Sequence, residues 1–288
     1  MFEIYVDSAA NLPAETVKKY GIHVIPLHTY VNDEEIKVFD PTLTQEEERK
    51  LGKKYYDAIR QGAIVRSSLI NQEEFEEVFE EKLKEGVDIL YISLSKNISG
   101  TYNAARLASE ELLESYPERK ICLVDSLNAS LAQGILAIYA YEMREKGEGI
   151  TAIATKLSSL ALQMNGVFTV GNLKYLAKTG RINTATAYVG NVLSIKPILR
   201  GNKDGYIVQF EKIRGRKKAV QELIDLVCAN IIEPEKQIIG IAQADVYEES
   251  LYIMEEIQKR VKVREFINTS YDYCTGSHVG PDTLALFL

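Results

Sequence analysis

Residues 87–93 read Val-Asp-Ile-Leu-Tyr-Ile-Ser, and this almost continuously apolar stretch decides the fold of the first half of the chain. Such a run is typical of a strand buried on both faces of a parallel sheet. It is followed by an amphipathic stretch over 99–115, a second apolar run over 121–124 and another helical stretch over 129–146. Strands that alternate with helices predict a doubly wound, Rossmann-like α/β domain.

The segment before this stretch is predicted to add elements to the same domain. Apolar runs, caps and turn residues there predict a strand over 2–6, a helix from Pro13 to Gly21, strands over 23–30 and 35–39 around an Asn32-Asp33 turn, and helices over 49–60 and from Asn71 to Gly86. Pro26 falls within the first hairpin strand, where it is compatible only with an edge or a bulge, because proline has no N–H to donate.

Gly147 and Gly149 interrupt a helical pattern and predict a boundary between an N-terminal domain, residues 1–148, and a C-terminal domain, residues 149–288. Beyond the boundary, strands are predicted over 167–170, 195–199, 206–210, 238–242, 263–268 and 284–287, and helices over 172–178, 183–192, 216–231 and 247–260. The turn sequence at 202–205 indicates a hairpin, so the second domain is expected to contain a mixed sheet. The expected fold is α/β with two lobes.

The composition excludes several functions. The 288 residues include 34 Lys and Arg against 41 Asp and Glu, for a formal net charge of -7, which argues against binding to nucleic acid or an anionic membrane. No apolar stretch approaches the roughly 20 residues of a membrane span, and no secretion signal is visible, so a cytoplasmic protein is expected. Three scattered cysteines and three histidines support neither a disulfide framework nor a metal site, and no cofactor is expected.

The most informative polar segment covers residues 93–102, where an apolar strand leads to Ser95 and then to Ser99, Gly100 and Thr101 at the start of a helix. Free N–H groups and the helix dipole suit this place to a small anion. The spacing does not match a nucleotide-binding loop. Considered alone, the motif is explained more simply by a plain serine cap, with Gly100 allowing the helix to pack closely on the sheet.

Other candidates are weaker when each is considered alone. Asp-Ser pairs at Asp7-Ser8 and Asp125-Ser126 follow two predicted strands, where they either face a ligand or cap the next helix. Ser67 ends a short apolar run, Arg181 lies in a loop, and His278 is expected in a Gly- and Pro-rich turn, where a lone histidine is a functional candidate.

Taken in order, these segments resemble the DegV family of bacterial fatty-acid-binding proteins. Residues 6–13 are similar to the family's V-T-D-S-T-A-D-L-P, 95–102 to S-S-x-L-S-G-T-Y, 124–126 to V-D-S, 173–199 to L-x-Y-L-x-x-G-G-R-I…I-K-P-I-L, and 278–281 to the start of H-T-G-P-G. The resemblance implies an apolar tunnel between the two lobes that holds a long-chain fatty acid, whose carboxylate a separate kinase converts to an acyl phosphate. It also implies that the carboxylate ligands are Ser67, Ser95, Ser99, Gly100, Thr101 and His278, and that Arg181 lies at the tunnel mouth, facing the kinase.

The chain departs from the family pattern at residues 67–71, Ser-Ser-Leu-Ile-Asn, where the family has T-S-Q-P-S. Ser67 keeps a hydroxyl, but the loss of Gln and Pro leaves the shape of this loop and the chain-length preference open. Two alternatives also remain. One is a serine acyl hydrolase with His278 as base and Asp7 or Asp125 as its partner, although no G-x-S-x-G elbow occurs. The other is a binder of a small anionic metabolite.

Overall fold

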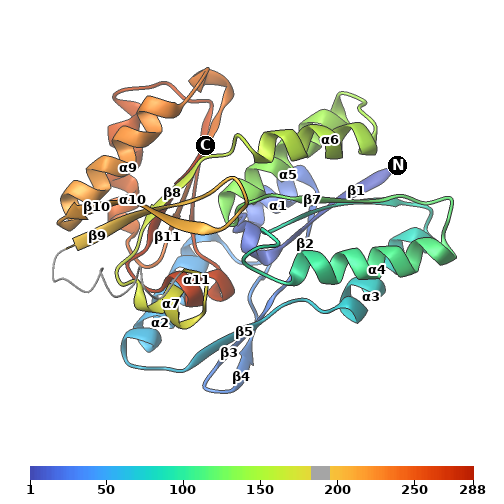
Figure 1. Cartoon of the computed structure of the whole chain (residues 1–288), viewed down its shortest axis with the longest axis horizontal. Coiled ribbons are helices and arrows are strands. Elements are labelled where there is room, and N and C mark those ends of the chain that lie inside the picture. Colours follow the sequence, from blue (N-terminus) through green and yellow to red (C-terminus); the bar gives the residue numbers. More distant parts are fainter. Residues whose placement is uncertain (183–194) are drawn as a thin grey trace.

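The computed structural model describes residues 1–182 and 195–288. The predicted helix over 183–192 lies outside these ranges. The described elements form a four-stranded, a six-stranded and a three-stranded sheet, with helices packed around them (Figure 1).

The predicted parallel sheet of the first lobe is confirmed. It consists of β1 (Phe2–Asp7), β2 (Ile22–Ile25), β6 (Asp88–Ser93) and β7 (Ile121–Asp125). Their order is β2-β1-β6-β7 and every neighbouring pair is parallel.

Helices cover both faces of this sheet. One face packs against α1 (Ala14–Tyr20), α5 (Leu131–Glu145) and α6 (Ile150–Ala161), and the other against α3 (Gln72–Lys84) and α4 (Thr101–Ser115). Leu90 and Ile92 point to the first face, whereas Ile89 and Tyr91 point to the second. Because all four are fully buried, the strand has to be apolar at almost every position.

The three-stranded sheet was only partly predicted. It contains β3 (His28–Val31), β4 (Glu34–Ile36) and β5 (Val65–Ser68), all antiparallel. The hairpin at Asn32-Asp33 forms as expected, with φ of 49° and 71°, which suits a tight primed turn. The single strand predicted over 23–30 is wrong: the chain breaks at Pro26 and contributes β2 and β3 to different sheets, because proline cannot continue a ladder.

The second lobe has the expected mixed sheet, in the order β10-β9-β8-β13-β11-β12. Its strands are β8 (Gly166–Thr169), β9 (Ile195–Gly201), β10 (Ile207–Arg214), β11 (Ile238–Gln243), β12 (Glu265–Ser270) and β13 (Leu284–Phe287). Only β11 and β12 pair in parallel among these described strands. The remaining helices are α2 (Gln45–Arg60), α7 (Lys174–Lys178), α9 (Arg216–Asn230), α10 (Tyr247–Gln258) and α11 (Tyr273–Val279), with short 3₁₀ turns η1 (Ser8–Ala10) and η2 (Pro234–Lys236).

Helix α5 joins the two lobes. It packs against β1 and β6 of the parallel sheet and against β11 of the mixed sheet (Figure 1). A Cβ atom at Gly240 of β11 would lie 2.6 Å from the Cβ of Leu131, so only glycine allows this close approach. Helix α6, which sequence reasoning missed, packs against α5 and β7. The domain boundary at 148/149 stays a prediction.

The helices of the described ranges include none with both the length and the apolar character that a bilayer crossing requires.

Candidate functional site

A cavity of about 340 Å³, the main cavity, lies between the two lobes and the three-stranded sheet. Its volume falls at the lower end of the range of roughly 300–1,000 Å³ typical of small-molecule sites. Most of its lining is apolar, with side chains that include Leu27, Leu94, Ile98, Phe168, Ile207 and Phe287. The lining also carries charged and hydrogen-bonding side chains. Five of them, which we call the polar corner, are Ser67, Ser99, Arg181, Thr275 and His278; Ser68, Asn128, Ser130 and Tyr271 also line the cavity.

The contact between Ser67 and His278 joins the three-stranded sheet to helix α11 at the polar corner. The Ser67 Oγ atom of β5 lies 2.9 Å from Nε2 of His278 on α11, although 211 residues separate them in the chain. The other ring nitrogen, Nδ1, is buried and has no hydrogen-bond partner within residues 1–182 and 195–288. A buried, unpaired ring nitrogen is an available hydrogen-bonding group for a ligand.

Burial, together with the positive charge of Arg181, lowers the pKa of His278 from 6.5 to about 4. The ring is therefore neutral at pH 7, with one N–H donor and one acceptor nitrogen. Arg181 itself donates from Nε to the carbonyl oxygen of Ile98 at 3.1 Å and also contacts the carbonyl of Thr179. The guanidinium thus connects the His278 side of the corner to the loop that carries Ser99.

His278 lies in helix α11, so the predicted turn is wrong. Asp272 caps this helix by accepting from the backbone N–H groups of Cys274 and Thr275 at 2.8 and 3.0 Å, and such a cap stabilises a helix start. Gly276 obscured the helix in the sequence, but it is needed for packing: a Cβ there would lie 2.3 Å from the Tyr56 hydroxyl.

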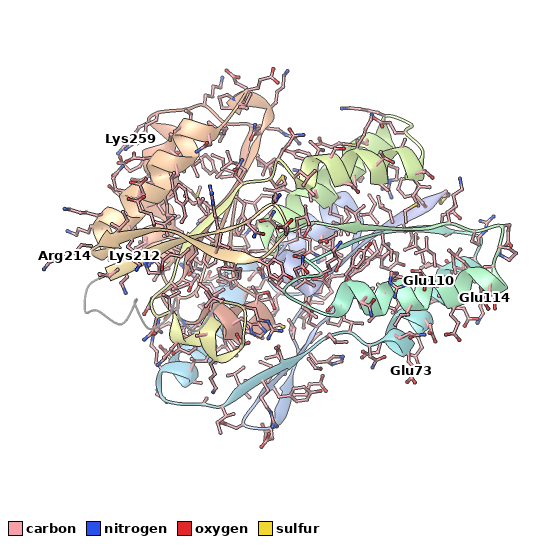
Figure 2. All side chains as sticks on the ribbon, viewed as in Figure 1. Glu73, Glu110, Glu114, Lys212, Arg214 and Lys259 are labelled. Carbon is pink, nitrogen blue, oxygen red and sulfur yellow. The ribbon has the colours of Figure 1, made fainter. Side chains whose placement is uncertain are left out.

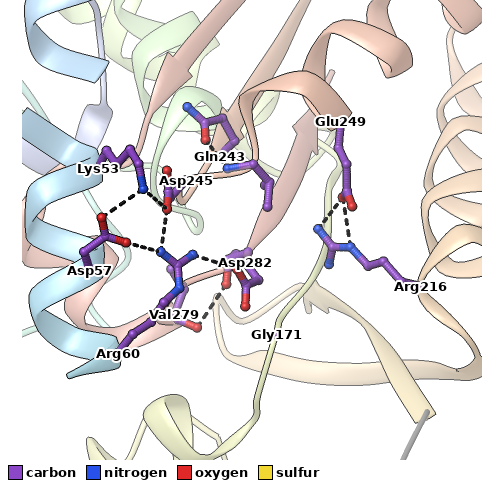
Figure 3. A network of polar contacts seen from close by, with 12 residues as sticks. Lys53, Asp57, Arg60, Gly171, Arg216, Gln243, Asp245, Glu249, Val279 and Asp282 are labelled. Carbon is purple, nitrogen blue, oxygen red and sulfur yellow. Dashed lines mark hydrogen bonds and ion pairs between the residues drawn. The ribbon is translucent and has the colours of Figure 1, made fainter. Parts of the chain in front are cut away.

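An ion-pair network holds the turn that follows α11 (Figure 3). Arg60 of α2 contacts Asp245 and also Asp282, at 2.8 Å, and Lys53 pairs with Asp57 at 2.8 Å beside it. Asp282 has a φ of 65°, a backbone conformation that needs support from neighbouring contacts. The two ends of α11 are thereby anchored, which fixes the position of His278.

Thr275 lines the cavity one turn before His278, and sequence reasoning missed it. On a helix, residues three apart share a face. The relation would have been visible in the sequence had α11 been predicted as a helix.

The predicted anion site at the start of α4 is divided between the cavity and the core. Ser99 and Gly100 line the cavity. Thr101, the first residue of the helix, is fully buried and lies against Ser99, with 2.8 Å between the two hydroxyl oxygens. Gly100 lies close to the residue that follows β5, since a Cβ there would lie 2.9 Å from Cδ2 of Leu69.

Ser95 is outside the described lining of the main cavity. It is fully buried, its hydroxyl donates to the carbonyl oxygen of Gly205 at 3.0 Å, and its Oγ accepts from the N–H of Asn97 at 3.3 Å. The side chain therefore joins the loop after β6 to the hairpin between β9 and β10.

The two Asp-Ser pairs act within the fold, and the described cavity lining includes none of their four residues. Asp7 is fully buried and accepts from four groups: Ala9 N–H at 3.1 Å, Tyr91 O–H at 2.9 Å, Leu94 N–H at 3.0 Å and Gln133 Nε2 at 3.0 Å. Burial raises its pKa to about 6. Ser8 accepts from the N–H of Leu27 at 3.0 Å.

The second pair has a similar capping geometry. Asp125 accepts from the N–H of Leu127 at 2.9 Å, and the hydroxyl of Ser126 donates to the carbonyl of Asn128 at 3.0 Å. Within the described residues, neither Asp7 nor Asp125 hydrogen-bonds to His278. The carboxylate that a Ser-His-Asp triad requires is thus missing from the described surroundings of His278.

The pKa of His278 predicts a pH dependence of stability. Between pH 6.5 and about 4 the unfolded histidine binds a proton that the folded one does not, so stability should fall as the pH is lowered through this window. The loss attributable to His278 is on the order of 3 kcal/mol. Urea unfolding at pH 7 and pH 4.5 should show a smaller loss for His278→Gln than for the parent. Equal losses for the two proteins would contradict this assignment.

The chain is similar over its whole length to known proteins. A family model described as "Uncharacterised protein, DegV family" matches residues 1–288. A DegV domain-containing protein of Clostridium perfringens is 37% identical over 287 residues, which cover 99% of this chain and 96% of that protein.

Two solved structures are similar over nearly their whole length. One is a DegV lipid-binding protein from Thermotoga maritima, with a TM-score of 0.84 and 30% identity, covering 100% of this chain and 98% of that one. The other is DegV from Bacillus subtilis, described as a fatty-acid-binding protein, with a TM-score of 0.84 and 28% identity, covering 99% and 98%. Since the family model spans the whole chain and the curated relative shares more than a third of its residues, the chain belongs to the DegV family.

Proposed function

We propose that this protein binds a long-chain fatty acid in the main cavity and presents the carboxylate to a separate kinase, which forms the acyl phosphate. The observation that carries the proposal is a largely apolar cavity with one polar corner, where Ser67 and His278 meet at 2.9 Å and a buried histidine nitrogen has no partner in the described residues. The lipid-binding and fatty-acid-binding relatives support it.

The apolar lining provides most of the binding free energy. An acyl chain of about 16 carbons gains roughly 0.8 kcal/mol for each buried CH₂ group, or about 10 kcal/mol before the cost of ordering the ligand. Walls contributed by two lobes and a third sheet can shield much of such a chain from water.

The polar corner is proposed to bind the carboxylate head group of the fatty acid. A carboxylate that leaves water has to be hydrogen-bonded or paired with a cation. In the proposed complex, the Ser67 hydroxyl donates to Nε2 of His278, which places the ring proton on Nδ1. The Nδ1–H group of His278 and the Ser99 hydroxyl then donate to the carboxylate, and the positive end of α4 at Gly100 adds favourable charge. Arg181 lies near enough to lower the pKa of His278 and supplies a compensating cation. Ser95 supports the loop instead of binding the ligand.

The kinase is proposed to approach from the side where positive charge collects. Figure 2 shows Glu73, Glu110 and Glu114 over α3 and α4, and Lys212 and Arg214 on β10 at the opposite side of the molecule. Arg216, two residues after Arg214, is already paired with Glu249 at 2.7 Å. An acidic surface on the partner would complement the β10 cations.

Native mass spectrometry of the protein as purified, followed by denaturation, tests the binding. The expected result is one fatty acid per chain. A mass without ligand that stays unchanged after incubation with several fatty acids would refute the binding proposal.

Incubation of the loaded protein with the cognate kinase and ATP then tests presentation. Acyl phosphate should form, and Lys212→Glu with Arg214→Glu should reduce its rate while fatty acid remains bound. A loaded protein that yields no acyl phosphate would refute presentation without affecting the binding proposal.

A further inference from the structure

A second cavity, which we call the rear cavity, adjoins the main one. It has a volume of about 520 Å³ and lies among α6, α9 and the strands β8 to β10. Four residues line both cavities and form the wall between them: Leu127, Asn128, Gly166 and Gly201. The rear lining is mixed: its apolar side chains include those of Met164, Val167 and Leu226 together with the exposed Leu162 and Phe210, and its polar ones include Asn165, Arg200, Asn202, Lys203 and Asn230.

The side chain of Asn128 fills the space between the two glycines of the wall. A Cβ atom at Gly166 would lie 3.1 Å from Oδ1 of Asn128, and one at Gly201 would lie 3.2 Å from the same atom. Neither glycine has a left-handed φ, so the backbone conformation does not require glycine at these positions. The two glycines leave room for the amide, and the amide closes the wall.

The main chain at Asn128 is held independently of this amide. Its carbonyl oxygen accepts from the N–H of Ser95 at 2.7 Å and from the hydroxyl of Ser126 at 3.0 Å, and its N–H donates to Ser126 Oγ at 3.3 Å. Within residues 1–182 and 195–288, the side chain makes one long hydrogen bond, from Nδ2 to the carbonyl of Ser126 at 3.4 Å. The amide can therefore be removed while the turn keeps its main-chain contacts.

We infer that Asn128 is the end wall of the acyl chamber and sets the longest chain that the protein holds, an inference that rests on the proposed function. A longer chain would press methylene groups against a polar amide and strip it of water, which is unfavourable. Without the amide, the chamber opens into the larger rear cavity, and additional methylene groups gain buried area there.

The test is a competition in which the protein is offered an equimolar series of saturated fatty acids, each two carbons longer than the last, and the bound lipids are measured by native mass spectrometry. For Asn128→Ala, the ratio of the next longer chain to the chain preferred by the parent should rise about tenfold, the gain expected from two buried methylene groups. Asn230→Ala is the matched control, because Asn230 lines only the rear cavity. It should leave the distribution unchanged.

A second substitution checks whether the loss of volume at the wall causes the shift in chain length. Adding Gly201→Ala to Asn128→Ala places a methyl group beside the vacated position and should return the distribution toward that of the parent. If Asn128→Ala does not fold, Asn128→Ser removes most of the wall and should produce the same shift. A parent that binds no fatty acid would overturn the proposed function. A parent that binds, with both Asn128 variants unshifted, would overturn the end-wall inference alone.

Discussion

Replacing both Ser67 and His278 with alanine is expected to lower the affinity for palmitate about ten- to a hundredfold. In the proposed complex His278 donates to the carboxylate while Ser67 holds the ring in the donating tautomer, and a hydrogen bond to a charged group contributes roughly 1.5–3 kcal/mol. The 2.9 Å contact between them means that removing one also leaves the other unsupported. Titration calorimetry on delipidated protein, with the bound lipid checked by mass spectrometry, measures the effect.

A matched control makes the same two kinds of substitution away from the cavity. Ser158 lies on α6 with its hydroxyl bonded to the carbonyl of Ala154, and His23 pairs with Glu3 at the surface. Ser158→Ala with His23→Ala should bind palmitate as the parent does. If the Ser67 and His278 double variant also kept the parent affinity, the carboxylate would have to be bound elsewhere.

Asp7→Ala is expected to lower the free energy of unfolding by about 3–5 kcal/mol, because it leaves four buried donors without their acceptor. Each buried donor without an acceptor costs roughly 1–3 kcal/mol, unless a water molecule replaces the lost partner. Two of these donors belong to the side chains of Tyr91 in strand β6 and Gln133 in helix α5. The carboxylate thus connects β1 to β6 and α5. Urea unfolding followed by circular dichroism gives the value.

Asp125→Ala provides the comparison, since it removes the same side chain from a strand end in the same sheet. Its carboxylate bonds to the N–H of Leu127 and faces Lys96 near the surface, so a loss of about 1 kcal/mol is expected. Equal losses of unfolding free energy for the two variants would show that the four hydrogen bonds to Asp7 do not stabilise the fold more than the contacts of Asp125 do.

Local signals in the sequence were sufficient for most of the fold. The apolar run at 87–93 predicted a strand buried on both faces. The prediction is correct because helices cover both faces of this strand in the structure. Asn71 predicted a helix start, and it forms a capping box with Glu74. These features depend on residues that lie a few positions apart, which a single sequence displays directly.

The failures have a common physical cause, which is contact with distant residues. Helix α11 was hidden by Gly276, whose missing side chain makes room for Tyr56 on another helix. Pro26 separates two strands that look continuous, and only the pairing partners reveal that they belong to different sheets.

In the candidate site, too, the features that depend on nearby residues were predicted, and those that depend on distant residues were not. Ser67, Ser99, Gly100, Arg181 and His278, which the motifs suggested, all line one cavity. Ser95 belongs to the same motif, yet its hydroxyl is used by Gly205, 110 residues away in the chain. Asn128 carried no signal at all, because its place in the wall depends on two glycines of another sheet.

The main cavity takes its walls from both lobes and from the three-stranded sheet, so an acyl chain inside it would complete a core shared by all three. Folding and lipid binding are then thermodynamically linked: a ligand at a hundred times its dissociation constant adds about 2.7 kcal/mol to the stability of the folded state. The melting temperature of such a protein would rise and fall with the supply of free fatty acid. The empty chain, which opens more readily, would be the form that proteases degrade first.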